Sequence, residues 1–424
     1  MPENIFKTFG CRLNIFETEV IKNFVSENRI ENVAVINTCA VTAEAERKAK
    51  REIQKLKKEN EDVFLIVTGC ASQLNPAHFE AFKEVDLVLG NSEKLIGNYW
   101  SEISKIKSNT EPANSTAFVS DIMSCTKLPS KNVKPFDTKT RAFIGIQNGC
   151  DHRCTFCVIP YARGNSRSLT KIQVKEQIEK LVSLGVKEVV LTGVDITSWG
   201  SDLEEDSKLG DLIEFILDQI PELPRLRISS IDSIEVDPKL INLLCQEKRL
   251  MPHLHLSLQS GDNMILKRMK RRHSREDVID FCNNVKNHRA EIAFSADVIA
   301  GFPTETPDMF ENTVSIIEEC HIDRLHVFPF SARPGTPASK MPQISQTIIE
   351  ERAAHLREIS NKKLTQHLKL KIGSHQNVLI EANLKGFTED FSKVTFPEGP
   401  KIGDIVKMRI TDQINNGLLG NPIL

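Results

Sequence analysis

Residues 141–157 read Arg-Ala-Phe-Ile-Gly-Ile-Gln-Asn-Gly-Cys-Asp-His-Arg-Cys-Thr-Phe-Cys, a strand-like apolar stretch followed by a loop with three cysteines. Cys150, Cys154 and Cys157 form a C-x3-C-x2-C pattern in that loop. Three thiolates at this spacing can hold a four-iron cluster and leave its fourth iron free to bind a small molecule. The stretch therefore predicts a reaction site at the end of a strand.

Structural zinc is the main alternative for this loop, because His152 could complete a Cys3His tetrahedron. Zinc sites usually take their ligands as two separated pairs, and no matching pair follows at such a spacing. Gly149 before the first cysteine and Phe156 before the last are instead typical of the radical S-adenosylmethionine (SAM) signature. We therefore expect iron and sulfur rather than zinc.

The composition is that of an ordinary globular protein, with 40% apolar residues in a chain of 424, which predicts about two to three domains. The sequence shows no signal-peptide pattern, and no apolar run approaches the ~20 residues that span a bilayer. Ten cysteines are too dilute for a disulfide scaffold in a chain of this length. We therefore expect a cytoplasmic protein whose reduced cysteines bind metal.

Residues 1–105 alternate short apolar strands with helices, which predicts an open parallel α/β sheet. The expected strands are Ile5–Phe9, Val33–Asn37 and Val63–Thr68. A helix is expected from Thr42 to Lys58, with acidic residues in its first turn and lysines in its last.

A second group of cysteines follows these three strands. Cys11, Cys39 and Cys70 each lie just past the carboxyl end of one strand, and in a parallel sheet those ends share one edge. The alternative is that they are small core residues, the usual role of a lone cysteine. Their loop positions favour a second cluster. The other four cysteines are expected to be structural: Cys125, Cys245, Cys282 and Cys320.

Residues 106–135 lack periodicity and are interpreted as a linker, followed by a core at 136–365. Strand and helix patterns repeat six times in the core, which predicts a partial (β/α)6 barrel. The expected strands are Phe143–Gln147, Glu188–Thr192, Arg225–Ser229, His253–Gln259, Ala293–Ile299 and Arg324–Phe330.

The carboxyl ends of barrel strands form the functional face of such a fold. Polar residues and glycines stand at these strand ends, where they could bind the amino acid, ribose or adenine part of a ligand. A single glycine or polar residue at a strand end more often serves the turn itself. Only the joint placement of these residues around the cysteine loop therefore supports a binding site. With Phe156 of the loop, the expected cofactor contacts are Gly193, Asp195, Ser230, Gln259 and Gly301.

Several segments together resemble the radical SAM methylthiotransferase family over essentially the whole chain. Three resemble its amino-terminal cluster motifs, namely residues 7–14, 35–42 and 67–73, and residues 150–164 resemble its radical SAM loop. Residues 154–168, 191–200 and 325–338 are most similar to the branch that acts on threonylcarbamoyladenosine in tRNA.

This resemblance implies an enzyme that converts C–H to C–SCH3 at carbon 2 of N6-threonylcarbamoyladenosine 37, next to the tRNA anticodon. It implies SAM and two [4Fe–4S] clusters, with Cys150, Cys154 and Cys157 holding the cluster that cleaves SAM. The other triad would hold the cluster that carries the inserted sulfur. It further implies tRNA as a partner, an electron donor such as flavodoxin or ferredoxin, and no membrane.

Residues 370–424 change to short alternating strands punctuated by glycines, which predicts a small antiparallel β-barrel. The segment resembles the RNA-binding TRAM domain, although a purely structural cap is the alternative. Expected strands are Val378–Glu381, Phe391–Phe396 and Asp404–Thr411.

The whole-chain balance of 55 basic and 57 acidic residues does not decide for or against RNA. The threonylcarbamoyl group carries a carboxylate, so a cationic partner at the barrel mouth is expected. Arg163 and Arg333 follow the cysteine loop and the sixth strand, and are the candidates. The alternative is that either arginine pairs with a phosphate or with a neighbouring acidic residue. The remaining alternatives are an isopentenyladenosine methylthiotransferase and a non-catalytic iron–sulfur RNA-binding protein.

Overall fold

The computed structural model describes residues 3–41, 43–108, 116–129, 140–397 and 399–423. Its first part is an open, wholly parallel sheet of five strands in sequence order, β1-β2-β3-β4-β5. The α/β sheet predicted for this part is confirmed. Its strands are β1 (Ile5–Thr8), β2 (Val33–Thr38), β3 (Phe64–Gly69), β4 (Leu87–Leu89) and β5 (Thr116–Phe118).

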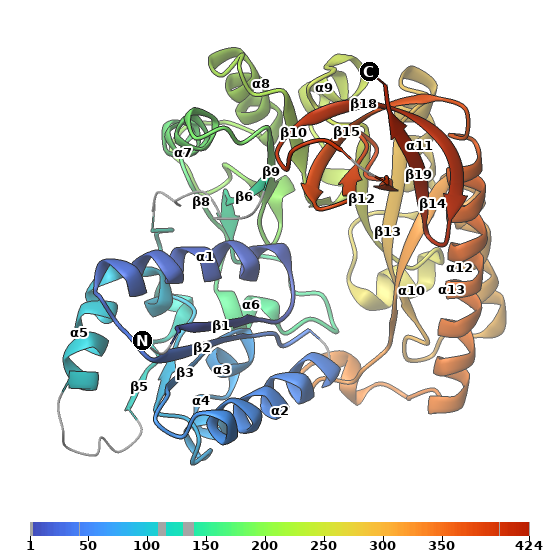
Figure 1. Cartoon of the computed structure of the whole chain (residues 1–424). Helices are drawn as coiled ribbons and strands as arrows, with labels where there is room; N and C mark the ends of the chain where they lie inside the picture. The colour runs from blue at the N-terminus through green and yellow to red at the C-terminus, as the bar shows by residue number, and fades with distance from the viewer. Residues whose placement is uncertain (1–2, 42, 109–115, 130–139, 398, 424) are drawn as a thin grey trace.

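A hydrophobic core lies on each face of this sheet, because successive residues of a strand point to opposite sides. Val35 of β2 packs with α1 (Arg12–Glu27) and α5 (Gly97–Ser108) on one face. Ile36, the next residue, packs with α2 (Ala43–Glu59) on the other. Both layers are visible in Figure 1.

The central part is a partial barrel of six parallel β/α units, as predicted. Its strands form two sheets, β10-β9-β6 and β11-β12-β13-β14, which separate at Ser229. The strands are β6 (Arg141–Gly145), β9 (Glu188–Thr192), β10 (Arg225–Ile228), β11 (Ser230–Ile231), β12 (His253–Gln259), β13 (Ala293–Ala300) and β14 (Ile322–Pro329). The outer helices include α7 (Lys171–Ser183), α8 (Leu209–Gln219), α9 (Pro238–Gln246), α11 (Arg275–His288), α12 (Pro307–Glu319) and α13 (Gln346–Lys369).

The carboxyl-terminal part is a closed barrel in the order β15-β16-β17-β19-β18. Its pairs are antiparallel except for β17 with β19, which run parallel. This barrel is consistent with the expected TRAM domain. The strands are β15 (His375–Ala382), β16 (Lys385–Phe387), β17 (Lys393–Thr395), β18 (Ile405–Ile414) and β19 (Gly417–Pro422).

This small barrel packs against the amino ends of the core strands. Arg225, the first residue of β10, donates from Nη2 to the carbonyl oxygen of Asn377 at 2.9 Å, and Arg227 donates to that of Thr388 at 3.0 Å. The cysteine loop follows the carboxyl end of β6, so this loop and the small barrel lie at opposite ends of the core strands. Figure 1 shows the small carboxyl-terminal barrel in red at the upper right, with α13 running down the right side.

The expected linker differs most from the structure. Thr116–Phe118 forms β5, which pairs in parallel with β4 and completes the amino-terminal sheet. Three residues are too few to show a periodicity, so the sequence pattern did not reveal this strand. Residues 109–115 and 130–139 of the expected linker lie outside the described residues. No helix among the described residues is long and apolar enough to cross a membrane.

Candidate active site at two cysteine triads

The core triad, Cys150, Cys154 and Cys157, lies on one tightly anchored loop. The Cys150 amide donates to the carbonyl oxygen of Gly164 at 3.0 Å, and the Thr155 amide donates to that of Met269 at 3.0 Å. Gly149 has φ +78°, and a Cβ there would lie 1.9 Å from the carbonyl oxygen of Asn165. A side chain cannot be accommodated at that contact, so the loop requires glycine before its first cysteine.

The amino-terminal triad is assembled from three strand ends, as predicted. Cys11 precedes the first residue of α1, Cys39 follows β2 directly, and Cys70 follows β3 as the first residue of α3 (Cys70–Leu74). Gly10 allows the close approach of two of these ends, because a Cβ there would lie 2.8 Å from Cys39 Sγ.

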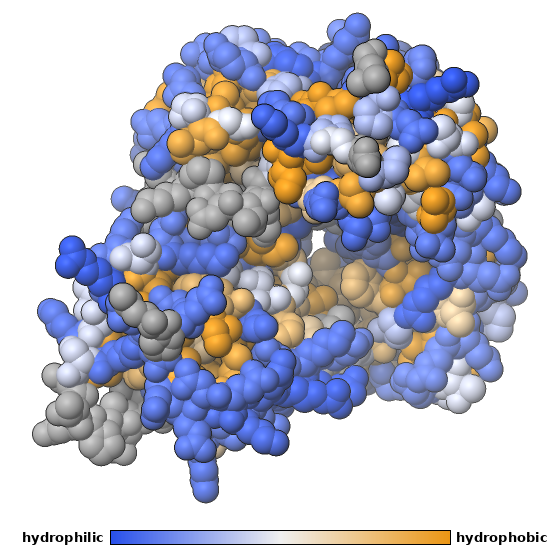
Figure 2. All heavy atoms as spheres, viewed as in Figure 1, coloured by the Kyte–Doolittle hydropathy of each residue, from blue (hydrophilic) through white to orange (hydrophobic). Residues whose placement is uncertain are grey.

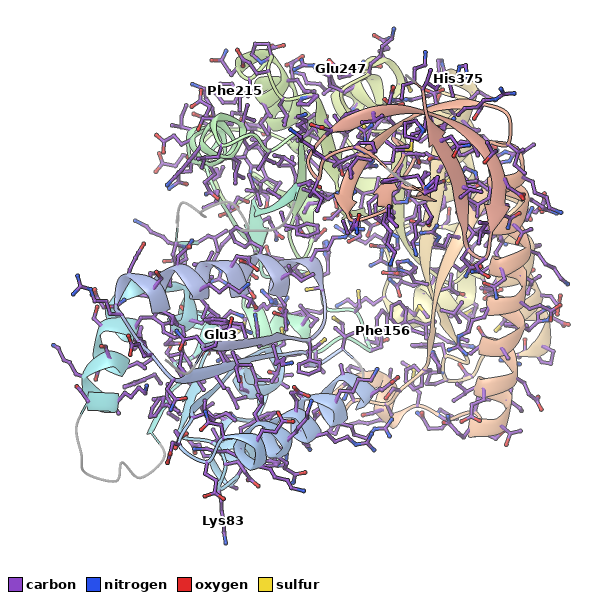
Figure 3. The ribbon with its side chains drawn as sticks, viewed as in Figure 1. Glu3, Lys83, Phe156, Phe215, Glu247 and His375 are labelled. Carbon is purple, nitrogen blue, oxygen red and sulfur yellow. The ribbon has the colours of Figure 1, made fainter. Side chains whose placement is uncertain are left out.

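Both triads face one cavity of about 310 Å³, which all six cysteines line. Figure 2 shows this face of the molecule hollowed at its centre, and Figure 3 shows Phe156 at the edge of the hollow. All six are free cysteines. Residues separated by more than one hundred positions in the sequence therefore meet at a single reaction chamber.

The environment of the sulfur atoms fits iron–sulfur clusters. Burial raises the pKa of Cys39 and that of Cys157 to about 11, so both are neutral thiols without a cationic partner such as iron. The Val41 amide donates to Cys39 Sγ, and the Ile159 amide to Cys157 Sγ, each at 3.4 Å. Such N–H···S bonds stabilise cluster-bound sulfur.

His152 does not favour the zinc alternative. Its Nε2 lies 2.9 Å from Asp195 Oδ2 and 3.4 Å from Glu235 Oε1, so the imidazole is engaged by two carboxylates. Asp195 also accepts from the hydroxyl of Ser198 at 2.6 Å. The histidine therefore holds the loop to the segment that follows β9 instead of completing a Cys3His set.

Arg163 lines the cavity that the two triads share, but its side chain is already bound by other residues of the protein. Its side chain is 2% exposed. Nη1 donates to Glu17 at 2.7 Å and to Asn148 at 2.9 Å, while Nη2 donates to Glu17 at 3.0 Å and to Asn14. Nε donates to Cys70 Sγ at 3.2 Å. Arg163 thus joins the core to the amino-terminal triad.

The expected cofactor contacts divide into two groups. Five of them line the same cavity as the cysteines, namely Phe156, Gly193, Asp195, Ser230 and Gln259. Gly301 has another role, because a Cβ there would lie 2.6 Å from the Ile349 side chain of α13. Its missing side chain makes room for this helix, and a contact with the cofactor stays a prediction.

Three polar side chains on β12, β13 and β14 were not predicted from the sequence. His255 Nε2 lies 2.9 Å from Asp297 Oδ1, and His326 Nδ1 lies 3.4 Å from the same oxygen. Burial alone would raise the pKa of Asp297, but hydrogen bonds from the two histidines lower it to about 2. Polar residues alternating with leucines in β12 were the available signal, since they face the barrel interior.

Arg333 lies where a substrate could reach it. It lines a cavity of about 650 Å³ that Phe156, Gln259 and Asp297 also line. Nη1 lies 3.8 Å from Glu46 Oε2, whereas Nε and Nη2 are buried without a hydrogen-bond partner among the described residues. Unsatisfied buried donors are costly, so an acceptor from a ligand would stabilise this side chain.

Comparison with known proteins agrees with this architecture. A model of the radical SAM superfamily matches residues 144–317, and one described as Uncharacterized protein family UPF0004 matches residues 4–90. The solved structure of the radical SAM methyltransferase TsrM from Kitasatospora setae has a TM-score of 0.58 at 13% identity, covering 80% of this chain and 74% of that one. Fold and cysteine loop together define a radical SAM protein.

Sequence relatives identify the family more closely. Threonylcarbamoyladenosine tRNA methylthiotransferase MtaB of Rickettsia prowazekii is 48% identical, covering 95% of this chain and 93% of that protein. The tRNA-2-methylthio-N(6)-dimethylallyladenosine synthase of Neorickettsia sennetsu is 31% identical, covering 96% and 90%. The chain belongs to the radical SAM tRNA methylthiotransferase family. It therefore binds SAM and two [4Fe–4S] clusters, which the two triads fit.

Proposed function

We propose that this protein methylthiolates carbon 2 of N6-threonylcarbamoyladenosine at position 37 of tRNA. The observation that carries this proposal is the meeting of both cysteine triads at one cavity. Replacing an aromatic hydrogen by a methylthio group requires a radical generator and a sulfur donor within reach of the same carbon atom. The similarity to the Rickettsia prowazekii protein favours the threonylcarbamoyl substrate.

The chain's own residues bind and orient the substrate and the cofactors, and they exclude water from the site. When bound, the two clusters supply radical generation from SAM and the sulfur for transfer. Gly193 and Ser230 line the chamber between the triads, and Asp195 braces the cysteine loop through His152. A nucleotide of an anticodon loop is already single-stranded, so it can enter such a chamber at modest unstacking cost.

Arg333 is proposed to bind the carboxylate of the threonylcarbamoyl group. Its two unpartnered nitrogens can donate to both oxygens of one carboxylate, a strong and directional contact. An isopentenyl group has no acceptor for these donors, so it would leave them unsatisfied. The cavity could therefore discriminate between the two tRNA substrates.

The substitution Arg333→Leu tests this assignment. We expect turnover on threonylcarbamoyl-bearing tRNA to fall by about tenfold or more, roughly 1.4 kcal/mol, while SAM cleavage without RNA is retained. Lys340→Leu is the matched control, because Lys340 is an exposed cation in the same segment. Full activity of the Arg333 variant, or an equal loss in both variants, would contradict carboxylate recognition.

Mass spectrometry of tRNA nucleosides tests the function itself. The reconstituted enzyme, with SAM and reductant, should form the 2-methylthio product from tRNA bearing the threonylcarbamoyl group. Product formed only from isopentenyl-bearing tRNA would assign the chain to the other branch. A protein that forms no 5′-deoxyadenosine from SAM would instead be a non-catalytic iron–sulfur RNA-binding protein.

Two further assignments rest on this function. Reductive cleavage of SAM requires a one-electron donor, and we propose a small carrier such as flavodoxin or ferredoxin. The tRNA substrate and the six reduced cysteines favour action in the cytoplasm. Reduction of the isolated enzyme by either carrier, followed by 5′-deoxyadenosine formation, would support the first assignment.

A further inference from the structure

Three arginines surround the ring of Phe391, in the loop before β17. The guanidinium carbon lies 4.6 Å from the ring centroid for Arg141, 5.0 Å for Arg227 and 5.6 Å for Arg12. Arg141 and Arg227 come from the core, and Arg12 is the first residue of α1. The aromatic ring of the small barrel thus contacts both other parts of the molecule.

The negative charge near this ring is already engaged. Glu188 is ion-paired with Arg141, with Arg227 at 2.7 Å and with Arg225 at 3.6 Å, and Glu381 is ion-paired with Arg141 at 2.8 Å. Arg12 has no hydrogen-bond or ion-pair partner in the part of the chain that the structure describes. The cluster therefore carries excess positive charge, and its unpaired member is Arg12.

Arg12 also lines a ligand-sized space. A cavity of about 520 Å³ is lined by Arg12 and by the amino-terminal cysteines Cys11 and Cys39, and also by His255, Asp297 and His326 of the core. The front face in Figure 2 is hollowed in this central region, between the amino-terminal domain and the small barrel. A polyanion that enters the hollow would meet a cation held in place by stacking on Phe391.

We propose that Arg12 binds an anionic oxygen group of the RNA substrate, supplied either by a backbone phosphate beside nucleotide 37 or by the carboxylate on its N6 substituent. This deepens the proposed function and rests on it for the identity of the RNA. A carboxylate offers a planar set of acceptor oxygens and a phosphate a tetrahedral set, and a guanidinium can bind either of them bidentately. Phe391 positions Arg12, so the small barrel acts on the substrate site through this contact.

Equilibrium binding to the full-length protein tests the proposal without turnover. The probes are two anticodon stem–loop RNAs of equal sequence, one with adenosine and one with N6-threonylcarbamoyladenosine at position 37. Arg12→Gln should weaken binding by about tenfold. An equal loss for both RNAs, with the slope of log K against log salt reduced by about one, identifies a phosphate. A loss confined to the modified RNA identifies the carboxylate, which Arg12 would then bind together with Arg333.

The control is Lys22→Gln, which removes one exposed positive charge from the same helix. Arg12→Lys checks folding, and it should restore much of the affinity if a phosphate is bound. Unchanged affinity of Arg12→Gln for both RNAs, or the same loss in the Lys22 variant, would overturn the proposal. Product analysis of the wild-type enzyme is independent, so a failure of the proposed function is recognised separately.

Discussion

The two cysteine triads are built in opposite ways. Cys150, Cys154 and Cys157 come from eight consecutive residues, and hydrogen bonds from the loop's own backbone hold their loop. The amino-terminal triad has no such local frame, because its members follow three different strands. Its geometry depends on the register of the whole sheet and on a side chain from another part of the molecule, Arg163.

This difference predicts which of the two clusters a given substitution will disturb. A change in the loop should disturb SAM chemistry and leave the amino-terminal sheet intact. A change in the sheet, or at its contact with the core, should disturb the auxiliary cluster while the loop keeps its shape. The four predictions below test this separation.

Removing the cysteines should have the largest effect. Cys150→Ala, Cys154→Ala or Cys157→Ala should abolish 5′-deoxyadenosine formation, because the iron site that binds SAM is lost. Replacing the three amino-terminal cysteines together should remove about half of the iron and leave SAM cleavage measurable, because only one of two clusters is lost. Iron analysis and chromatography of the products measure both outcomes. Loss of cleavage at full iron content would contradict this division of roles.

Breaking the contact that Arg163 makes between the core and the amino-terminal triad should have the next largest effect. Arg163→Met leaves Glu17 buried with Lys94 as its remaining ionic partner, at 2.7 Å. Removing one partner of a buried ion pair costs about 3–5 kcal/mol. We expect a lower thermal midpoint and loss of auxiliary-cluster iron before loss of SAM cleavage. Lys175→Met is the control, since its ion pair with Glu179 lies on the helix surface and contributes little.

The same contact makes the amino-terminal part sensitive to acid. Burial alone would raise the pKa of Glu17, but Arg163 and Lys94 lower it from 4.5 to about 2. A lowered pKa stabilises the fold above pH 4.5, and this contribution is lost as pH falls from 4.5 to 2. It amounts to at most about 3 kcal/mol. Circular dichroism of metal-free protein should show that Glu17→Gln flattens the acid transition, whereas an unchanged profile would exclude Glu17 as its cause.

The sequence predicted most of the fold because the strong signals are local. Apolar periodicity located the six core strands, and His253–Gln259 has the bounds expected. It did not reveal β5, whose three residues are too short to show a pattern, or the parallel pairing of β17 with β19, which depends on closure of the barrel. Pairing between distant segments is decided by the packing of the whole domain.

The candidate site, like the fold, could be predicted from the sequence where its signals are local. Cysteine spacing and strand ends identified both triads, since each depends on one short motif or on one sheet edge. The roles of the arginines depend on their three-dimensional surroundings. Arg163 looked available in its motif, yet Glu17, which lies 146 positions away, binds it. Arg12 stands in the motif at residues 7–14, but its position against Phe391 is seen only in the structure.

The smallest predicted effects separate backbone conformation from contact at three glycines. Gly10, Gly149 and Gly185 all have positive φ, where alanine costs on the order of 1–3 kcal/mol. Gly185→Ala is the matched control, because a Cβ there meets nothing within 4 Å. It should lower stability slightly and change neither cluster.

Gly149→Ala and Gly10→Ala should then differ in which triad they disturb. At Gly149 the added carbon meets a backbone carbonyl of the loop at 1.9 Å, so SAM cleavage should fall while auxiliary iron is kept. At Gly10 it meets Cys39 Sγ at 2.8 Å, so auxiliary iron should fall while SAM cleavage continues. Iron content, 5′-deoxyadenosine yield and thermal midpoint, measured for the three variants, show which triad each substitution disturbs. The same pattern of losses in all three would mean that strain, and not the separate construction of the triads, governs both sites.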